Sequence, residues 1–454
     1  MVAGSLRIAS VRFGVWLLGK YRMNRSFTIC VFALSCWSFG NACNAENWPG
    51  WRGPRGDGSS LDSEVVTSWD AETGKNIVWK TTTPGTGHAS PIVWEDRVFL
   101  TACLPEEKTR VLICFDRKTG EQIWRKNVFR APLESIHSLN SFASGTPVTD
   151  GELVYVAFLK VDGRTIPAPN VGSPRQITPG RIVVAAFDFS GELSWKKEIG
   201  DFISAHGFCS CPVLFEDLLI VNGDHDGDSY LVALDKQNGE ERWRIDRENK
   251  IRSYVTPVIR KIDDRTQMVL SGSQHILSVD PHNGKTHWQI DGPTEQFVAS
   301  MVYDGSLFFM TCGYPDYYVM GIKPTGTGNV TESHVAWESR AARAYVPSPV
   351  VLNGYLIVAD DRGTANCFDA ATGEQHWKAR FGSGFNASLI HANGLVYMIA
   401  KDGKTKVVKP GKKVEIVAEN ELGEFVSASP AISHGQLFIR GEKSLFCIGN
   451  TSAN

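Results

Sequence analysis

Side chains able to bind a ligand or move a proton recur in the loops of this 454-residue chain. Histidine, tyrosine, asparagine, arginine and aspartate can donate or accept hydrogen bonds, and several of them can hold a metal or transfer a proton. The candidates for one binding cluster are His88, His137, Asn140, His206, Asp224, His225, Arg252, Tyr254, Arg343 and Tyr345. The alternative is that these residues are solvated loop tips, since loops are generally polar.

One aspartate-rich run has the spacing of a metal-binding loop. Asp224, Asp226 and Asp228 stand at positions 1, 3 and 5, and Asp235 stands at position 12, as in a calcium loop. However, Ser229 stands where such a loop needs glycine, and Asp235 also begins an ordinary turn. A hairpin turn is therefore the favoured interpretation of this run, and a weak metal site is the alternative.

Sequence motifs for catalysis are absent. The chain contains no GxSxG elbow, no HExxH pair, no phosphate-binding Walker loop and no dinucleotide fingerprint. We therefore assign no catalytic residue. Lysine plus arginine (47) nearly balance aspartate plus glutamate (49), so charge gives no reason to expect a nucleic-acid partner.

A repeated unit must position the loop residues. Residues 348 to 377 read as four short strands joined by turns, with the hairpin signal Asn353-Gly354 after the first strand. An Asp–Gly turn followed four residues later by Trp closes the unit and recurs along the chain. The tryptophans expected to pack between neighbouring units are Trp79, Trp124, Trp195, Trp243, Trp288, Trp337 and Trp377. A four-stranded unit repeating every 40–50 residues or so is typical of a β-propeller blade.

Eight first strands can be counted, most of them opening on a small residue and proline. They begin at Ser90-Pro91, Thr146-Pro147, Cys211-Pro212, Thr256-Pro257, Ser300-Met301, Ser348-Pro349, Ser388-Leu389 and Ser429-Pro430. The last unit has three strands, whereas residues 76–82 form an isolated strand containing Trp79. The sequence therefore predicts an all-β, eight-bladed propeller of four-stranded antiparallel blades, closed by an N-terminal strand that completes the last blade.

Three units depart from the pattern. The fifth has Lys323-Pro324 in place of the Asp turn, and the seventh has Val417 at the expected Trp position. The second contains a Pro- and Gly-rich insertion, residues 160–181, which we expect to be a surface loop.

Cysteine usage leaves disulfides open. Cys114, Cys367 and Cys447 share one repeat position that holds a small residue in other blades, which indicates packing rather than pairing. Cys103 could face Cys114 across a hairpin, whereas Cys209 and Cys211 lie two residues apart on one strand face, where a bridge is awkward.

The predicted organisation has four parts. Residues 1–45 have the charged, apolar and small-residue regions of an export signal, with Met1 or Met23 as the start and cleavage expected after Ala45. A retained anchor, or a lipid on Cys43, is the alternative. Residues 46–75 form a Gly-, Pro- and Trp-rich arm that should lie on the body, 76–449 the propeller, and 450–454 a tail. We expect a periplasmic or extracellular location, with membrane contact only through such an anchor.

The turns at 233–243 (ALDKQNGEERW) and 368–377 (FDAATGEQHW) resemble the tryptophan-docking repeats of the quinoprotein propellers, which bind pyrroloquinoline quinone (PQQ). That family includes PQQ-dependent alcohol dehydrogenases and the non-enzymatic outer-membrane assembly factor BamB. The arm WPGWRGP (48–54), together with the run NGDHDG (222–227), also resembles exported PQQ-like repeat proteins of planctomycete-type bacteria. The resemblance covers about residues 76–449 and implies the fold.

Two functions follow from the resemblance. The first is an exported, non-enzymatic scaffold that presents one propeller face to a protein, peptide or glycan. The second is an oxidoreductase using PQQ and calcium. The dehydrogenases use an adjacent cysteine pair beside the quinone, and this chain has no such pair. The sequence therefore favours the scaffold.

Overall fold

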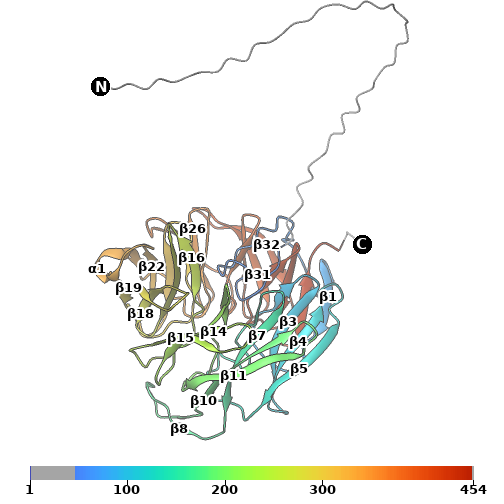
Figure 1. Ribbon diagram of the computed structural model, residues 1–454. Helices are drawn as coiled ribbons and strands as arrows, with labels where there is room; N and C mark the ends of the chain where they lie inside the picture. Colours follow the sequence, from blue (N-terminus) through green and yellow to red (C-terminus); the bar gives the residue numbers. More distant parts are fainter. Residues whose placement is uncertain (2–45, 452–454) are drawn as a thin grey trace, which may run out of the picture. The chain divides into compact units, whose positions relative to one another are not determined.

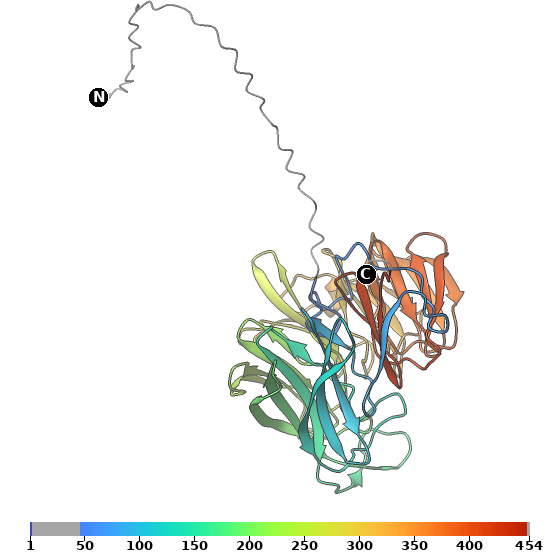
Figure 2. The same ribbon diagram turned by 90° about the vertical axis from the view of Figure 1, so that its right-hand side faces the viewer.

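The computed structural model describes Met1 and residues 46–451. The predicted signal segment, its cysteines and most of the tail lie outside the described residues. Eight antiparallel sheets follow one another along the chain, and almost no helix is present in the described part. The predicted eight-bladed propeller is therefore confirmed. Figures 1 and 2 show the sheets arranged side by side in the order of the sequence.

The first four blades span residues 92–291. Blade 1 contains β2 (Ile92–Trp94), β3 (Arg97–Leu104), β4 (Thr109–Asp116) and β5 (Gln122–Arg130). Blade 2 contains β6 (Val148–Thr149), β7 (Leu153–Val161), β10 (Gly180–Asp188) and β11 (Leu193–Phe202). Blade 3 contains β12 (Val213–Phe215), β13 (Leu218–Gly223), β14 (Tyr230–Asp235) and β15 (Glu241–Asp246). Blade 4 contains β16 (Val258–Ile262), β17 (Arg265–Gly272), β18 (His275–Val279) and β19 (Thr286–Asp291).

The remaining blades complete the ring. Blade 5 contains β20 (Val302–Tyr303), β21 (Phe308–Cys312), β22 (Tyr318–Ile322) and β24 (Val335–Ser339). Blade 6 contains β25 (Val350–Leu352), β26 (Tyr355–Ala359), β27 (Thr364–Asp369) and β28 (Gln375–Arg380). Blade 7 contains β29 (Ile390–Ala392), β30 (Leu395–Ile399), β31 (Lys404–Lys409) and β32 (Glu415–Glu421). Blade 8 contains β33 (Ala431–Ser433), β34 (Gln436–Arg440), β35 (Ser444–Ile448) and β1 (Ile77–Thr82).

Two insertions extend the blades. The predicted surface insertion of blade 2 folds into a small hairpin of β8 (Ile166–Pro167) and β9 (Gln176–Ile177). The irregular turn of blade 5 forms β23 (Gly328–Asn329), which pairs in parallel with β19, and the short helix α1 (Thr331–His334). No helix among the described residues combines the length and apolar character needed to cross a membrane.

The ring closes through the N-terminal strand. β1 pairs antiparallel with β35, and the register places Trp79 opposite Cys447. Four other cysteine or alanine positions of the repeat follow the same rule. Each lies opposite the tryptophan of its own blade: Cys114, Ala186, Ala233 and Cys367. A small residue at this position leaves room for the indole.

Each indole docks onto the next blade. Trp79 Nε1 donates to the carbonyl oxygen of Arg117 (2.8 Å), and Trp195 Nε1 donates to that of Lys236 (2.9 Å). Trp124, Trp243, Trp337 and Trp377 make the equivalent bond with the following blade. Trp288 differs and donates to Gln267 within its own blade, because blade 5 lacks the usual turn.

The tryptophan position of the seventh blade differs from the prediction. The ladder places Ala418, not Val417, opposite Val407 at the tryptophan position, because Val417 is the bulged residue. An indole reaches this core from the arm instead: Trp69 is 2% exposed and stacks on Tyr397 at 6.4 Å between ring centroids. Asn420 holds this segment by accepting from Trp69 N and donating to the Thr67 carbonyl.

The cysteine pairing across blade 1 is also not present. The ladder places Cys103 opposite Arg110 and Cys114 opposite Phe99, so the two sulfurs do not face each other. All seven cysteines of the described segment are free thiols.

Candidate binding site

The innermost residues of the blades form a ring in which most neighbours are joined by a hydrogen bond. Ser90 N donates to Thr146 Oγ1 of the next blade at 2.9 Å, and Ser348 N donates to Ser388 Oγ at 3.0 Å. The same link joins Thr256 to Ser300, Ser300 to Ser348, and Ser388 to Ser429, and Thr146 donates to the Cys211 sulfur. This bonding explains why a small side chain with an acceptor atom opens most first strands.

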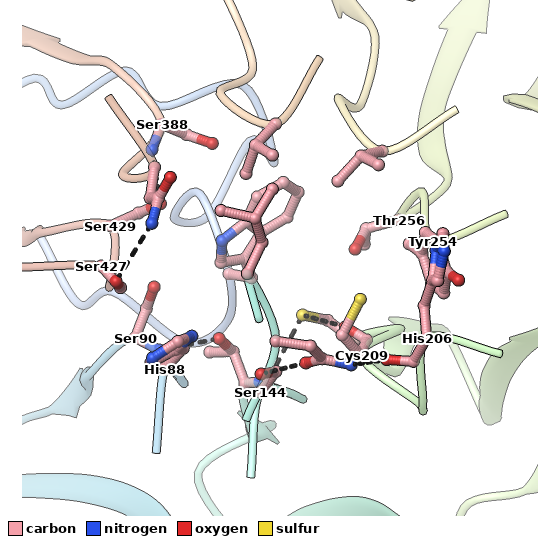
Figure 3. Close-up of a pocket in the computed structure, with 18 of the residues that line it drawn as sticks. His88, Ser90, Ser144, His206, Cys209, Tyr254, Thr256, Ser388, Ser427 and Ser429 are labelled. Atoms are coloured by element: carbon pink, nitrogen blue, oxygen red, sulfur yellow. Dashed lines mark hydrogen bonds between the residues drawn. The ribbon is translucent and has the colours of Figure 1, made fainter. Parts of the chain in front are cut away.

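This ring surrounds an axial cavity of about 140 Å³. Figure 3 shows its walls converging from blades around the axis, with His88, His206 and Tyr254 among the labelled side chains. Six of the ten predicted binding residues line this cavity: His88, His137, Asn140, His206, Tyr254 and Tyr345. The loops that join one blade to the next therefore bring these residues together, as the strand alternation predicts.

Aromatic rings and an amide organise one side of the cavity. The rings of His137 and His206 lie 4.8 Å apart, and the ring of His206 stacks on Tyr254 at 6.0 Å. Asn140 Nδ2 donates to the His206 carbonyl at 2.7 Å, and Asn140 Oδ1 accepts from Ser144 Oγ at 2.6 Å. These bonds fix the loops that carry the rings.

The cavity is electrically neutral. Among the described residues that line it, none is an aspartate, glutamate, lysine or arginine. Burial, followed by the charge of Arg252, lowers the pKa of His206 to about 3, and burial followed by Arg440 lowers the pKa of His88 to about 4. Both imidazoles are therefore uncharged at neutral pH and can both donate and accept a hydrogen bond.

Three predicted residues lie behind the cavity wall rather than in it. Asp224 and His225 are buried in the blade 3 hairpin, and Arg252 pairs with Asp226 at 2.7 Å. Arg343 is exposed and its guanidinium lies over the ring of Tyr317, outside the cavity.

The weak metal prediction is not supported. Asp224 pairs with Arg247 at 3.0 Å, and the exposed Asp228 pairs with Lys250 at 2.6 Å, so each carboxylate of the run already has a cationic partner. No group of three acidic, histidine or cysteine side chains suited to a metal occurs in the described part of the chain. The favoured hairpin turn therefore describes this run.

The sequence does not predict several of the residues that line the axial cavity. The sequence pattern marks the Ser and Thr residues of the ring only as small packing residues, although several of them line the cavity. Cys209, Asn386 and Trp51 also line the cavity. Trp51 belongs to the arm, and no local pattern in that irregular segment indicates where it lies.

The arm forms part of the wall of the axial cavity. Trp51 and Thr256 border both the axial cavity and a second cavity beneath it, lined by the arm and by the first strands of blades 2 to 4. Arg52, 1% exposed, anchors the arm by donating to the carbonyl oxygens of Pro349 at 2.6 Å and Leu389 at 3.1 Å. Arg52 therefore holds the arm, and with it Trp51, against the blades that surround the axial cavity.

Comparison with known proteins identifies the family of this chain. The model of the family described as outer membrane protein assembly factor BamB matches residues 59–166, 107–302 and 328–412. The chain belongs to this family. A search of curated proteins found no match.

Solved structures show the same architecture at low identity. BamB from Moraxella catarrhalis is 11% identical with a TM-score of 0.56, over 82% of this chain and 99% of that one. A europium-containing methanol dehydrogenase is 10% identical with a TM-score of 0.60, over 89% and 98%. A quinohemoprotein alcohol dehydrogenase from Pseudomonas putida HK5 is 12% identical with a TM-score of 0.58, over 89% and 80%. At these identities the likeness concerns the fold alone.

Proposed function

We propose that this BamB-family propeller is an exported, non-catalytic binding protein that accepts one uncharged sugar unit of a glycan in its axial cavity. The observation that carries the proposal is the lining itself, which combines aromatic rings with hydroxyl and amide groups and has no charge. Aromatic faces can pack against the C–H face of a sugar ring, while neutral donors and acceptors can satisfy its hydroxyls. Pockets of this kind fix orientation with a few convergent polar groups.

The same lining does not fit PQQ with calcium. PQQ carries three carboxylates, and a calcium ion needs several oxygen ligands, usually including carboxylates. The described residues around the axis offer neither a cation for the quinone nor an acidic side chain for the ion. The oxidoreductase alternative therefore rests on the shared fold with the two dehydrogenases.

Saturation-transfer NMR with neutral saccharides tests the proposal. Glucose, galactose and N-acetylglucosamine, each as monomer and short oligomer, should include at least one binder. His137→Ala should weaken that binder about tenfold or more, because this half-exposed ring lines the cavity. His282→Ala is the matched control, since His282 lies on an outer turn and contacts Asp280.

Two results would overturn this function. One is the absence of binding across the saccharide panel, and the other is equal binding by wild type and His137→Ala. Titration with PQQ, with and without calcium, is the second part of the test. Saturable quinone binding with substrate-dependent dye reduction would establish the oxidoreductase instead.

A further inference from the structure

A separate cavity lies at the seam where blade 8 meets blade 1. Its volume is about 250 Å³, and its walls include Gly87, Phe425, Arg440 and Glu442. His88 and Ser427 border both this cavity and the axial one. We call it the seam pocket. Its walls come from the segment before blade 1, the loop between blades 7 and 8, and the turn after β34.

Arg440 is an unbalanced buried cation in this wall. It is 2% exposed, and its Nη1 donates to the carbonyl oxygens of Thr101 at 2.8 Å and Ala89 at 3.2 Å. Its Nε is buried without a hydrogen-bond partner. No carboxylate of the described residues pairs with it, and burial alone lowers its pKa to about 10. A buried charge without a counterion is costly.

Other deeply buried arginines of the propeller differ in this respect. Arg110 pairs with Glu134, and Arg252 pairs with Asp226. Arg52 feels the charge of Asp57 and donates to several carbonyl oxygens. Arg440 thus lacks the acidic neighbour that each of these has.

A glycine of the pocket wall lies directly against the guanidinium of Arg440. A Cβ on Gly87 would lie 2.8 Å from Arg440 Nη2 and 2.9 Å from Nη1, so only glycine permits this approach. Gly87 and Arg440 border the same pocket. Any side chain at position 87 would therefore collide with the guanidinium.

The remaining walls indicate the kind of anion. Phe425 is 44% exposed at the pocket and offers an apolar contact, and burial keeps His88 neutral. Glu442 is exposed at the rim and would repel a multiply charged anion more than a singly charged one. A planar carboxylate matches the geometry of a guanidinium.

We propose that the seam pocket binds a carboxylate, which pairs with Arg440 while the apolar body of the ligand packs on Phe425. The chain end of a peptide and an acidic sugar both carry this group. Although His88 and Ser427 border both cavities, the two proposals can be tested separately, because neutral saccharides test the axial cavity and carboxylates test the seam pocket.

Arginine side-chain NMR of the ¹⁵N-arginine-labelled protein tests the proposal. Acetate and phenylacetate should shift the Arg440 Nε–H signal saturably, phenylacetate at lower concentration, whereas chloride at equal ionic strength should not. The signal is assigned by its loss in Arg440→Gln, which should also abolish phenylacetate binding measured by calorimetry. Peptides with free and amidated C-termini, and glucuronate beside glucose, then distinguish the two sources of the carboxylate.

Rim variants keep the test decisive if Arg440→Gln does not fold. Glu442→Gln should tighten phenylacetate binding about threefold by removing a repelling charge, and Phe425→Ala should weaken it. Glu374→Gln, at an exposed turn of blade 6, is the matched control and should change nothing. An Arg440 signal that no carboxylate moves, or an affinity unchanged in both rim variants, would overturn the proposal.

Discussion

Single side chains in this propeller are held in one protonation state by their hydrogen bonds. His225 shows this most clearly. It is 1% exposed, its Nδ1 accepts from the backbone N–H groups of Gly227 at 2.9 Å and Ile203 at 3.2 Å, and its Nε2 lies 3.0 Å from the Asp228 carbonyl oxygen. Only the neutral ring with its proton on Nε2 can make all three bonds.

This arrangement predicts a loss of stability in mild acid. Burial lowers the folded-state pKa of His225 to about 4, below the ordinary value of 6.5. As pH falls below about 6.5 the unfolded chain binds the proton first, so the free energy of unfolding decreases until about pH 4, by up to roughly 3 kcal/mol. Urea unfolding at pH 7.5, 5.5 and 4.5 should show this decrease, and His225→Gln should make it smaller.

His282→Gln serves as the control for that series. The hydrogen bond that His282 donates to the Asp280 carboxylate raises the pKa of His282, so its contribution is present at low pH and lost as pH rises. Removing it should leave the acid-side decrease in place. An unchanged pH profile in His225→Gln would contradict the assigned tautomer.

Turns and tryptophans form the joints between the blades. Gly239 has a φ of +72°, and a Cβ there would lie 2.5 Å from the Trp195 ring of the preceding blade. Gly120 meets Trp79 in the same way, at 2.6 Å. The turn glycine is therefore required twice, once for its backbone conformation and once for the neighbouring indole.

A pair of alanine variants separates these two requirements. Gly354 has a φ of +79° but nothing within 4 Å of an added Cβ. Gly354→Ala should therefore cost about 1 kcal/mol of backbone strain, while Gly239→Ala should cost a further 1–3 kcal/mol or so by displacing the indole. Urea unfolding of both variants measures the difference, and equal losses would show that the indole does not constrain the turn.

Local patterns predicted much of this element-level structure. The Asp–Gly–Trp spacing and the small residue before each proline were enough to count eight blades and to find the closing strand. They failed where a residue's partner comes from far away in the chain. The bulge of β32 moved the tryptophan position from Val417 to Ala418, and Trp69 of the arm packs in that core. Hairpin register likewise separated Cys103 from Cys114.

The candidate site was predictable to a similar extent. Loop topology correctly gathered residues such as His137, His206 and Tyr254 around one cavity. It could not show that Asp224 and His225 turn inward, because a tight hairpin of alternating polar residues gives no sign of burial. Nor could it show that Trp51 lies at the axis, since that position depends on Arg52 binding carbonyl oxygens of blades 6 and 7.

At the scale of the whole molecule, one seam differs from the other seven because its blade is built from both ends of the chain. β1 contributes the outer strand of blade 8, and Trp79 docks on blade 1 through Arg117. The buried guanidinium of Arg440 also crosses this seam to Thr101. The join is therefore held by a strand ladder, an indole and a cation.

Trp79→Ala should open this join selectively. Loss of the buried indole should cost about 3–5 kcal/mol, and hydrogen exchange measured by mass spectrometry should rise most in Ile77–Thr82 and Ser444–Ile448. Trp243→Ala, at the seam between blades 3 and 4, is the matched control and should leave those two strands protected. Equal exchange in both variants would show that closure does not depend on Trp79.

The arm is fixed to the first strands of blades 6 and 7 by Arg52, and this contact sets the place of Trp51 at the axis. Trp51 borders both the axial cavity and the neighbouring cavity, so its indole belongs to the wall that the two share. A small molecule in the axial cavity would therefore touch the arm as well as the blades, so any change in how the arm is seated would alter how that molecule is held.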